Sequence, residues 1–314
     1  MTNIEIEFKK YFTNTCDSVL VTEKADLDRT WWVRPSSLPY CGLRRFLTMA
    51  EKGLSEERHM NAESLYYTST GSSIHTVFQK VLGRGGKILG NWKCPKCNYT
   101  RELKKYRVCP KCGTSMTMHY KELELNHLAW RGHLDGLYIS IDGEWWVIDY
   151  KTCKLYFIHA RHKSKSAWRP YVSYSEQQDH YVPLVERSLK IKIAGWMLVF
   201  LSRDEPFKQN FVFSRRMSEN RKQAINNKIE LISTMHKKIF KIEKVSEVAE
   251  LYENKRCSSL SAHNNLFPFS PCPYAKDCFN RSDMVTKIKE IVHESKYLPL
   301  LQFMPKNIKK ELYE

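Results

Sequence analysis

The chain has 314 residues, of which 42% are hydrophobic and 27% are charged. These are ordinary values for a globular protein that buries a substantial core, and they exclude a disordered or fibrous chain. Lys and Arg number 51 against 34 Asp and Glu, so the net charge is +17. Such an excess favours a polyanionic partner over a basic surface kept only for solubility.

The sequence contains no stretch that is expected to cross or enter a membrane. Its longest apolar run, Ile193 to Leu201, is far too short to span a bilayer. The first ten residues are charged and lack the apolar stretch of a signal peptide. We therefore expect an intracellular, cytoplasmic and reducing compartment, in which the ten cysteines favour metal ligands over disulfides.

Residues 1–90 are expected to form an N-terminal lead-in and the first core helices. The segment 34–46 is typical of a capped turn that enters a helix, with Ser36 or Ser37 as the N-cap. Apolar residues then recur at helical spacing over 71–83, and this predicts a helix that ends at the glycines 83, 85 and 86.

Residues 91–118 form a short polar insertion with two Cys-Pro-Lys-Cys pairs, separated by eleven residues. This is the spacing of a zinc ribbon, in which two knuckles supply four thiolates to one Zn²⁺ ion: Cys94, Cys97, Cys109 and Cys112. A segment with so little apolar sequence could hardly fold without its metal. Its many Lys and Arg residues suit contact with DNA, but a purely structural or protein-docking module remains the alternative.

Residues 119–215 are predicted to form the core. Strands are expected at 119–130, 133–141 and 145–152, then a helix at 173–189 and strands at 191–202 and 207–215. We expect Pro183 to kink or break that helix. The loop 156–171 mixes cations with aromatic residues, so it could follow a single nucleic-acid strand or be an ordinary solvated loop. Residues 216–314 should form a helical arm, with a long helix at 218–254, and a C-terminal cysteine region. The order predicts an α/β fold around a mixed sheet.

Two segments of the core combine acidic and basic residues with strand-like sequence: RGHLDG at 131–136 and WWVIDYKT at 145–152. Alternation along a strand puts Asp149 and Lys151 on the same side. A buried carboxylate and ammonium at this spacing suit a divalent cation with a cationic group that steadies an attacking water. Taken alone, the pair would more often be a salt bridge at a sheet edge.

The loop between these strands makes a geometric test of a shared metal site. A two-residue turn at Asp142-Gly143 would point Asp135 away from Asp149. A joint site therefore requires a loop of odd length, such as a three-residue loop at 142–144 with Gly143 in a left-handed conformation, or a bulge at Gly136.

These motifs, taken together, resemble the RecB-type PD-(D/E)XK nucleases. GxxD, followed by hydrophobic-DxKT, is similar to the second and third motifs of that family. His75 in GSSIHTVFQ matches the family's upstream histidine, and SEQQDHY places Gln177 and Tyr181 in its Q-x3-Y motif. The segment SSLPYCGLRRF at 36–46 resembles the N-terminal pattern of that family. The matches follow the family's order across residues 36–181.

The resemblance implies a restriction-endonuclease-like core, in which a helix is followed by a three-stranded meander, a helix and a strand. It implies that one or two Mg²⁺ or Mn²⁺ ions are held by Asp135, Asp149, the carbonyl of Tyr150 and Glu124. Glu122 lies on the same predicted strand face as Glu124, which leaves that assignment open. The catalytic group it implies is His75, Asp135, Asp149, Lys151, Gln177 and Tyr181.

The remaining cysteines resemble the iron–sulfur subset of the family, which includes AddB-type and CRISPR-associated exonucleases. That resemblance implies a [4Fe–4S] cluster held by one N-terminal and three C-terminal ligands: Cys41, Cys257, Cys272 and Cys278. A second zinc site is the alternative.

The function that the resemblance implies is metal-dependent hydrolysis of DNA, by an exonuclease that processes ends and prefers single strands. Its partners would be single-stranded DNA or duplex ends, together with recombination, repair or replication proteins. Two alternatives stay open: a non-catalytic nucleic-acid binder on a nuclease scaffold, and a structure-specific endonuclease.

Overall fold

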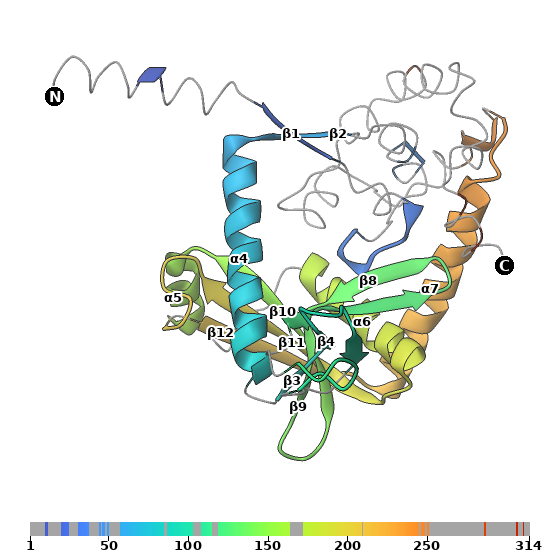
Figure 1. Ribbon diagram of the computed structural model, residues 1–314. Helices are drawn as coiled ribbons and strands as arrows, with labels where there is room; N and C mark the ends of the chain where they lie inside the picture. The colour runs from blue at the N-terminus through green and yellow to red at the C-terminus, as the bar shows by residue number, and fades with distance from the viewer. Residues whose placement is uncertain are drawn as a thin grey trace.

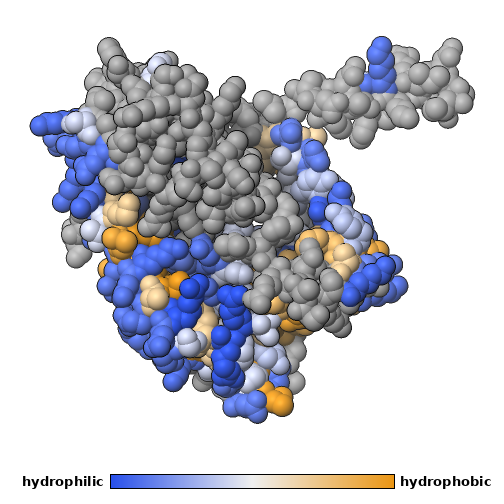
Figure 2. Space-filling view, turned by 180° about the vertical axis from the view of Figure 1, so that it is seen from behind, coloured by the Kyte–Doolittle hydropathy of each residue, from blue (hydrophilic) through white to orange (hydrophobic). Residues whose placement is uncertain are grey.

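A computed structural model describes residues 20–24, 31–37, 57–84, 87–102, 108–114, 119–163, 172–208 and 210–244, with a few isolated residues elsewhere. Among these residues, no helix combines the length and the apolar character needed to cross a membrane. The described surface seen in Figure 2 is mostly hydrophilic, with smaller hydrophobic areas between.

A five-stranded mixed sheet forms the centre of the molecule. Its order is β12 (Asn210–Arg216), β11 (Ile193–Ser202), β10 (Trp145–Cys153), β9 (Gly136–Ile139) and β3 (Ile88–Leu89). β10 and β11 are parallel, whereas the other neighbours are antiparallel. The predicted α/β arrangement around a mixed sheet is confirmed.

Helices cover both faces of this sheet (Figure 1). α4 (Ala62–Arg84) lies on the face that includes Ile148 and Tyr150, where Phe78 joins their buried cluster. α6 (Val172–Leu189) covers the opposite face, which includes Val147, and α7 (Glu219–Ile239) packs against α6. Alternation along β10 therefore sends successive side chains to different helices. α5 (Leu155–Lys163) follows β10 directly.

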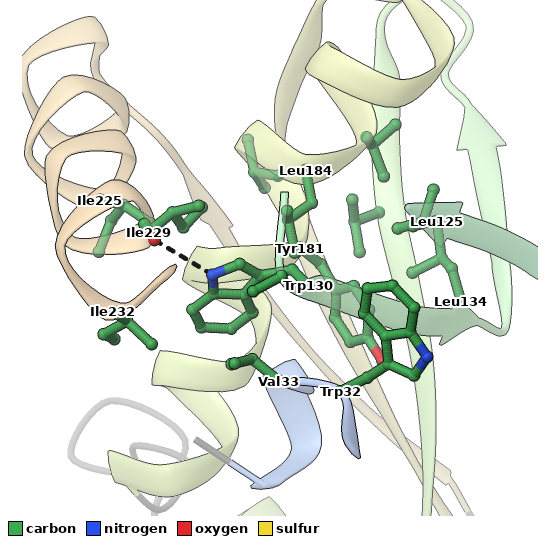
Figure 3. Packing of buried hydrophobic residues seen from close by; sticks show 14 of the residues in the cluster. Trp32, Val33, Leu125, Trp130, Leu134, Tyr181, Leu184, Ile225, Ile229 and Ile232 are labelled. Carbon is green, nitrogen blue, oxygen red and sulfur yellow. Dashed lines mark hydrogen bonds between the residues drawn. The ribbon is translucent and has the colours of Figure 1, made fainter. Parts of the chain in front are cut away.

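A hairpin of β7 (Leu123–His127) and β8 (Trp130–Leu134) precedes the central strands, and Leu128 turns it with φ of 53°. Its Trp130 is fully buried, and the indole Nε1 donates to the carbonyl of Ile229 on α7 at 3.2 Å. Figure 3 shows this ring between the α7 isoleucines and residues of α6 and β8. The hairpin is thus fixed to both helices, and its end leads into the central sheet at Asp135.

The remaining strands are short. β4 (Asn91–Lys93) and β5 (Thr100–Glu102) of the cysteine-rich insertion form a three-stranded sheet with β6 (His119–Lys121), which directly follows the insertion. β1 (Leu20–Lys24) pairs with β2 (Glu57–Asn61), and a 3-10 helix, η1, spans Pro35–Ser37.

Several element boundaries differ from the prediction. α4 begins nine residues before Gly71, because Asn61 caps it: the Asn61 side chain accepts a hydrogen bond from the Ser64 amide at 2.8 Å. α6 continues through Pro183 without a break. The run 119–130 is divided among β6, β7 and the start of β8, and part of the predicted loop 156–171 is the helix α5.

The predicted helix at 218–254 is shorter than expected. Ser218 caps α7, and the helix ends at Ile239. Phe240 and Ile242 then turn into the core, where both are buried, so continuing the helix would expose two large apolar side chains.

Candidate active site and four-cysteine centre

The turn between β9 and β10 has odd length. Ile139 pairs with Trp145, and the Ser140 amide donates to the Glu144 carbonyl at 2.9 Å, which leaves a three-residue loop at 141–143. Gly143 has φ of 78°, the left-handed conformation that the loop requires. The predicted odd-length loop is confirmed, although it starts one residue earlier than the 142–144 alternative.

This register brings Asp135 next to Asp149. Ile148 pairs with Gly136, so the next positions along the two strands are Asp149 and Asp135. Asp135 lies in a bend between β8 and β9, where the strand turns away from β10. The backbone pairing of β9 with β10 ends at Ile148, and the Asp135 carboxylate accepts the next hydrogen bond instead: Oδ2 accepts from the Tyr150 amide at 2.7 Å.

Asp135 is held by several neighbours. Gln79 on α4 donates from Nε2 to Asp135 Oδ1 at 3.1 Å. His75, one turn earlier, places Nδ1 at 3.6 Å from Asp135 Oδ2. The carboxylate is 7% exposed. Two residues on one face of α4 thus reach a single buried carboxylate.

Asp149 and Lys151 form an ion pair on the α6 side of the sheet. Lys151 Nζ lies 2.7 Å from Asp149 Oδ2. The same ammonium donates to Gln177 Oε1 at 3.3 Å and lies 5.1 Å from the centre of the Tyr174 ring. Gln177 and Tyr174 are both on α6, so that helix positions the lysine.

Tyr181 lies one turn beyond Gln177 and is almost fully buried. Its hydroxyl donates to the carbonyl of His133 on β8 at 2.8 Å. Burial, together with the nearby Asp149 and Asp135, raises the pKa of the Tyr181 phenol. Tyr181 therefore acts as a neutral donor that fixes β8 just before the Asp135 bend.

The acidic groups influence one another's ionisation. Burial and the charge of Asp135 raise the pKa of Asp149, although Lys151 opposes the shift. Burial would also raise the pKa of Asp135, but bonds from His75 and the Tyr150 amide outweigh it and lower that pKa. Burial opposes protonation of His75, yet Asp135 raises its pKa. A cation placed between the two carboxylates would relieve the repulsion that raises the pKa of Asp149.

Glu124 lies outside this group. Its carboxylate is paired with the Arg131 guanidinium, which donates from Nε at 2.9 Å. Burial raises the pKa of Glu124, but the pairing with Arg131 outweighs burial and lowers that pKa. Glu122 is the acidic residue near the site instead: Gln79 Nε2 lies 3.3 Å from Glu122 Oε1. Burial and then Asp135 raise the pKa of Glu122.

Gln79 was not identified from the sequence, and Glu122 was named only as the residue that left the Glu124 assignment open. Gln79 follows His75 by four residues, so helical spacing could have indicated it. Glu122 follows β6 and precedes β7, outside either strand, so it does not share a strand face with Glu124 as expected.

The four cysteines of the insertion converge. Their sulfur atoms all lie within 4.8 Å of one another, with Cys94 to Cys112 and Cys97 to Cys109 each at 3.7 Å. A disulfide would require a sulfur–sulfur distance of about 2.05 Å. Four thiolates about 2.3 Å from a central ion would be separated by about 3.8 Å, so the geometry fits a tetrahedral metal site.

The two halves of the centre have the same backbone. The Cys94 amide donates to Tyr99 and the Asn98 amide to Cys94, at 2.8 and 3.0 Å. The Cys109 amide donates to Thr114 and the Gly113 amide to Cys109, both at 2.9 Å. Asn98 and Gly113 have φ of 59° and 67°. Each Cys-Pro-Lys-Cys pair therefore has the same knuckle conformation.

The thiols also match a cation site electrostatically. Burial opposes ionisation of Cys94, but the amides of Cys97 and Lys96 lower its pKa to about 6. The Tyr99 backbone favours the Cys97 thiolate, yet burial and the neighbouring thiols raise the pKa of Cys97 to about 11. Both thiols can ionise together only when a cation balances their charge.

The proposed iron–sulfur ligands Cys41, Cys257, Cys272 and Cys278 lie outside the described residues.

No protein-family model matches the chain, and no curated protein matches it. Among solved structures, the chain is similar to an alkaline exonuclease (LHK-Exo) from Laribacter hongkongensis, with 13% identity and a TM-score of 0.40 over 73% of this chain and 94% of that one. The same exonuclease in complex with dAMP matches with 12% identity and a TM-score of 0.38 over the same shares. A structure titled SSO0001 matches with 15% identity and a TM-score of 0.32, over 73% of this chain and 87% of that one. These low values assign no activity to the chain, so the function proposed below rests on the geometry of the site.

Proposed function

We propose that the chain is a metal-dependent deoxyribonuclease with a restriction-endonuclease-like core of the PD-(D/E)XK type. The observation that carries the proposal is the meeting of two buried carboxylates at the point where β9 leaves β10. Asp135 caps the Tyr150 amide, and Asp149 is paired with Lys151 beside it. Burying two carboxylates side by side is unfavourable for folding alone, and it is common where a divalent cation binds.

Asp135 and Asp149, with the carbonyl of Tyr150, would hold the Mg²⁺ or Mn²⁺ ion. Glu122 replaces Glu124 as the additional carboxylate in this proposal, because Gln79 links it to Asp135. Carboxylate and carbonyl oxygens are the ligands that these ions prefer. When bound, the ion would polarise the phosphate and stabilise negative charge on the leaving oxygen.

The protein's own groups would orient the reactants. Lys151 is fixed by Gln177 and Asp149, so its remaining proton can point to an attacking water. His75 and Gln79 hold Asp135 from α4, and Tyr181 holds β8 from α6. Both helices thus keep the carboxylates in place before substrate arrives, which lowers the reorganisation needed during reaction.

A DNA end, with preference for a single strand, is the proposed substrate. The net charge of +17 favours a polyanion. Aromatic rings for stacking lie near the carboxyl ends of β10 and β11. Arg203, whose amide donates to Cys153 at the end of β10, lies 4.5 Å from the ring of Tyr67. Phe207 is 64% exposed and stacks on Phe78 at 5.0 Å. Such rings can bind unpaired bases.

A digestion time course with end-labelled DNA tests this function. In Mg²⁺ or Mn²⁺, we expect the label to be released progressively from single strands, and more slowly from duplexes. Chelation with EDTA should stop the reaction, because the carboxylates alone cannot activate a phosphodiester. A circular single strand is the control, since an exonuclease leaves it intact. Cleavage of the circle would identify an endonuclease, and binding without any cleavage would support a non-catalytic nucleic-acid binder.

The four-cysteine centre is proposed to hold zinc, and Cys41, Cys257, Cys272 and Cys278 are proposed to hold a [4Fe–4S] cluster. Four sulfurs at tetrahedral spacing support the first assignment. The second is supported only by the resemblance of its spacing.

The two metals should be separable by mutation. We expect protein purified without oxygen to be brown, with absorbance at about 400 nm from iron–sulfur charge transfer, and to contain zinc as well. Cys97→Ser should remove zinc and spare iron, whereas Cys278→Ser should remove iron and spare zinc, because each set of ligands serves one centre. Metal analysis of both variants, with Cys153→Ser as the control, checks this. Colourless protein that contains only zinc would refute the cluster.

A further inference from the structure

The three-stranded sheet that carries the knuckles contacts the candidate active site through Tyr120. Tyr120, in the middle of β6, donates a hydrogen bond from its hydroxyl to the backbone carbonyl of Asp135 at 2.6 Å. The same hydroxyl lies 3.4 Å from the Leu89 carbonyl. Burial and the nearby Tyr150 and Asp135 raise the pKa of the Tyr120 phenol, so the group stays a neutral donor. Tyr120 of β6 thus holds Asp135, the residue at the bend.

The Tyr120 ring is closely surrounded. It meets Trp92 edge to face, with centroids 5.4 Å apart and an interplanar angle of 90°. A Cβ atom at Gly90 or Gly136 would collide with the Tyr120 hydroxyl. Gly136 directly follows Asp135, so the close approach occurs at the bend itself. The hydroxyl therefore has little room to occupy any other position.

The position of Tyr120 depends in turn on the sheet that leads into the knuckles. Tyr120 pairs with Trp92 between β6 and β4, and the first knuckle begins at Cys94, directly after β4. The knuckles contribute few apolar groups besides the cysteines, so a metal ion supplies much of the free energy that orders such a segment. Loss of the ion would release β4 and β6 together with Tyr120.

We propose that Tyr120 is a positioning residue that couples the four-cysteine centre to the carboxylate site. Metal in the cysteine centre keeps Tyr120 bonded to the Asp135 carbonyl, and this keeps the Asp135 side chain against the Tyr150 amide. The affinity of the carboxylates for a divalent cation then depends on whether the cysteine centre is occupied. This last consequence rests on the proposed function of the carboxylate site.

The Tyr150 amide offers a direct measure of the coupling, without DNA or a divalent cation. Its hydrogen is protected by the Asp135 carboxylate, because β9 does not pair with β10 beyond Ile148. Any movement of Asp135 should expose it to hydrogen exchange. Exchange therefore reports the position of Asp135, whereas Mn²⁺ binding reports the consequence for the metal site.

The test compares Tyr120→Phe with Tyr99→Phe in the full chain. Both changes remove one hydroxyl from an aromatic residue close to the knuckles. Among the described residues, the Tyr99 hydroxyl makes no hydrogen bond to the carboxylate site, so Tyr99→Phe serves as the matched control. We expect Tyr120→Phe to retain zinc and to raise the exchange rate of the Tyr150 amide about five-fold, the effect of one lost hydrogen bond. Its affinity for Mn²⁺ should fall about ten-fold, as for other groups that support metal ligands. Tyr99→Phe should match the wild type in both.

A second variant, Cys112→Ser, removes the metal and leaves Tyr120 in place. It should raise exchange at Tyr150 at least as much as Tyr120→Phe does. Unchanged exchange in the zinc-retaining Tyr120→Phe protein would overturn the coupling, whether or not the protein cleaves DNA. Suppose that Tyr120→Phe raises exchange at Tyr150 while the wild type neither binds Mn²⁺ nor cleaves DNA. That result would support the contact between Tyr120 and Asp135 and overturn the nuclease proposal.

Discussion

Asp149→Asn is expected to reduce metal-dependent DNA cleavage by at least about 10³-fold, the scale at which loss of a metal ligand or a charge-stabilising group lowers a rate. The substitution keeps the shape of the side chain but removes the charge that would hold the cation. DNA affinity should stay within about two-fold of wild type, because it comes from the basic surface. Single-turnover cleavage and fluorescence anisotropy with the same labelled strand measure the two effects.

Thermal unfolding separates a metal ligand from a structural carboxylate in the same variant. The folded protein raises the pKa of Asp149, so the ionised group lowers stability as pH rises through that pKa. At neutral pH, Mn²⁺ should therefore raise the melting temperature of the wild type and leave that of Asp149→Asn unchanged. Asp142→Asn, the same change in the exposed turn of this hairpin, is the control. A Mn²⁺-dependent shift retained by Asp149→Asn would show that the cation binds elsewhere.

The register between Asp135 and Asp149 could be predicted in part because a strand has a strict two-residue alternation. For the two residues to share a face, either the loop between them had to have odd length or Gly136 had to form a bulge, and Gly143 provides the left-handed residue of an odd-length loop. The cysteine knuckles were predictable for a similar reason. Their spacing is local, and Gly113 marks the left-handed position in one of them.

The groups around the carboxylates could not be predicted from such local rules. Tyr120 reaches Asp135 across fifteen positions of sequence, and Gln79 reaches it across fifty-six. Both contacts depend on how α4 packs against β6 and the central sheet, for which no residue pattern gives evidence. The resemblance implied Glu124, on a single predicted strand that also contained Glu122, but β6 ends at Lys121 and β7 begins at Leu123.

Tertiary packing also changed the helix boundaries. Gly71 and Pro183 are poor residues for a helix interior, and each lies inside a continuous helix. Around Pro183, the buried Val182, Leu184 and Val185 pack into the main core. Burying three apolar side chains contributes roughly 5 kcal/mol, more than the roughly 3 kcal/mol that a proline costs a helix.

Lys151→Ala should separate cleavage from metal binding. In the wild type, the ammonium is paired with the Asp149 oxygen that a cation would use, so the two positive charges compete. Removing the lysine leaves Asp149 more strongly negative and should tighten Mn²⁺ binding about ten-fold, a conservative fraction of the Coulomb energy between unit charges about 4 Å apart. Cleavage should nevertheless fall at least about 10²-fold, because no group remains to orient the attacking water.

Titration calorimetry with Mn²⁺ and single-turnover cleavage, made on the same preparation, provide the two measurements. Lys154→Ala is the matched control, since Lys154 is the exposed lysine that follows β10. It should change neither quantity by more than about two-fold, the effect of a screened surface charge. If Lys151 has only a structural role, its removal should change the affinity for Mn²⁺ in the opposite direction. Without the lysine, Asp149 would lose its position, and affinity for Mn²⁺ would fall together with cleavage. That result would remove Lys151 from the catalytic group and leave it as the partner that holds Asp149 in place.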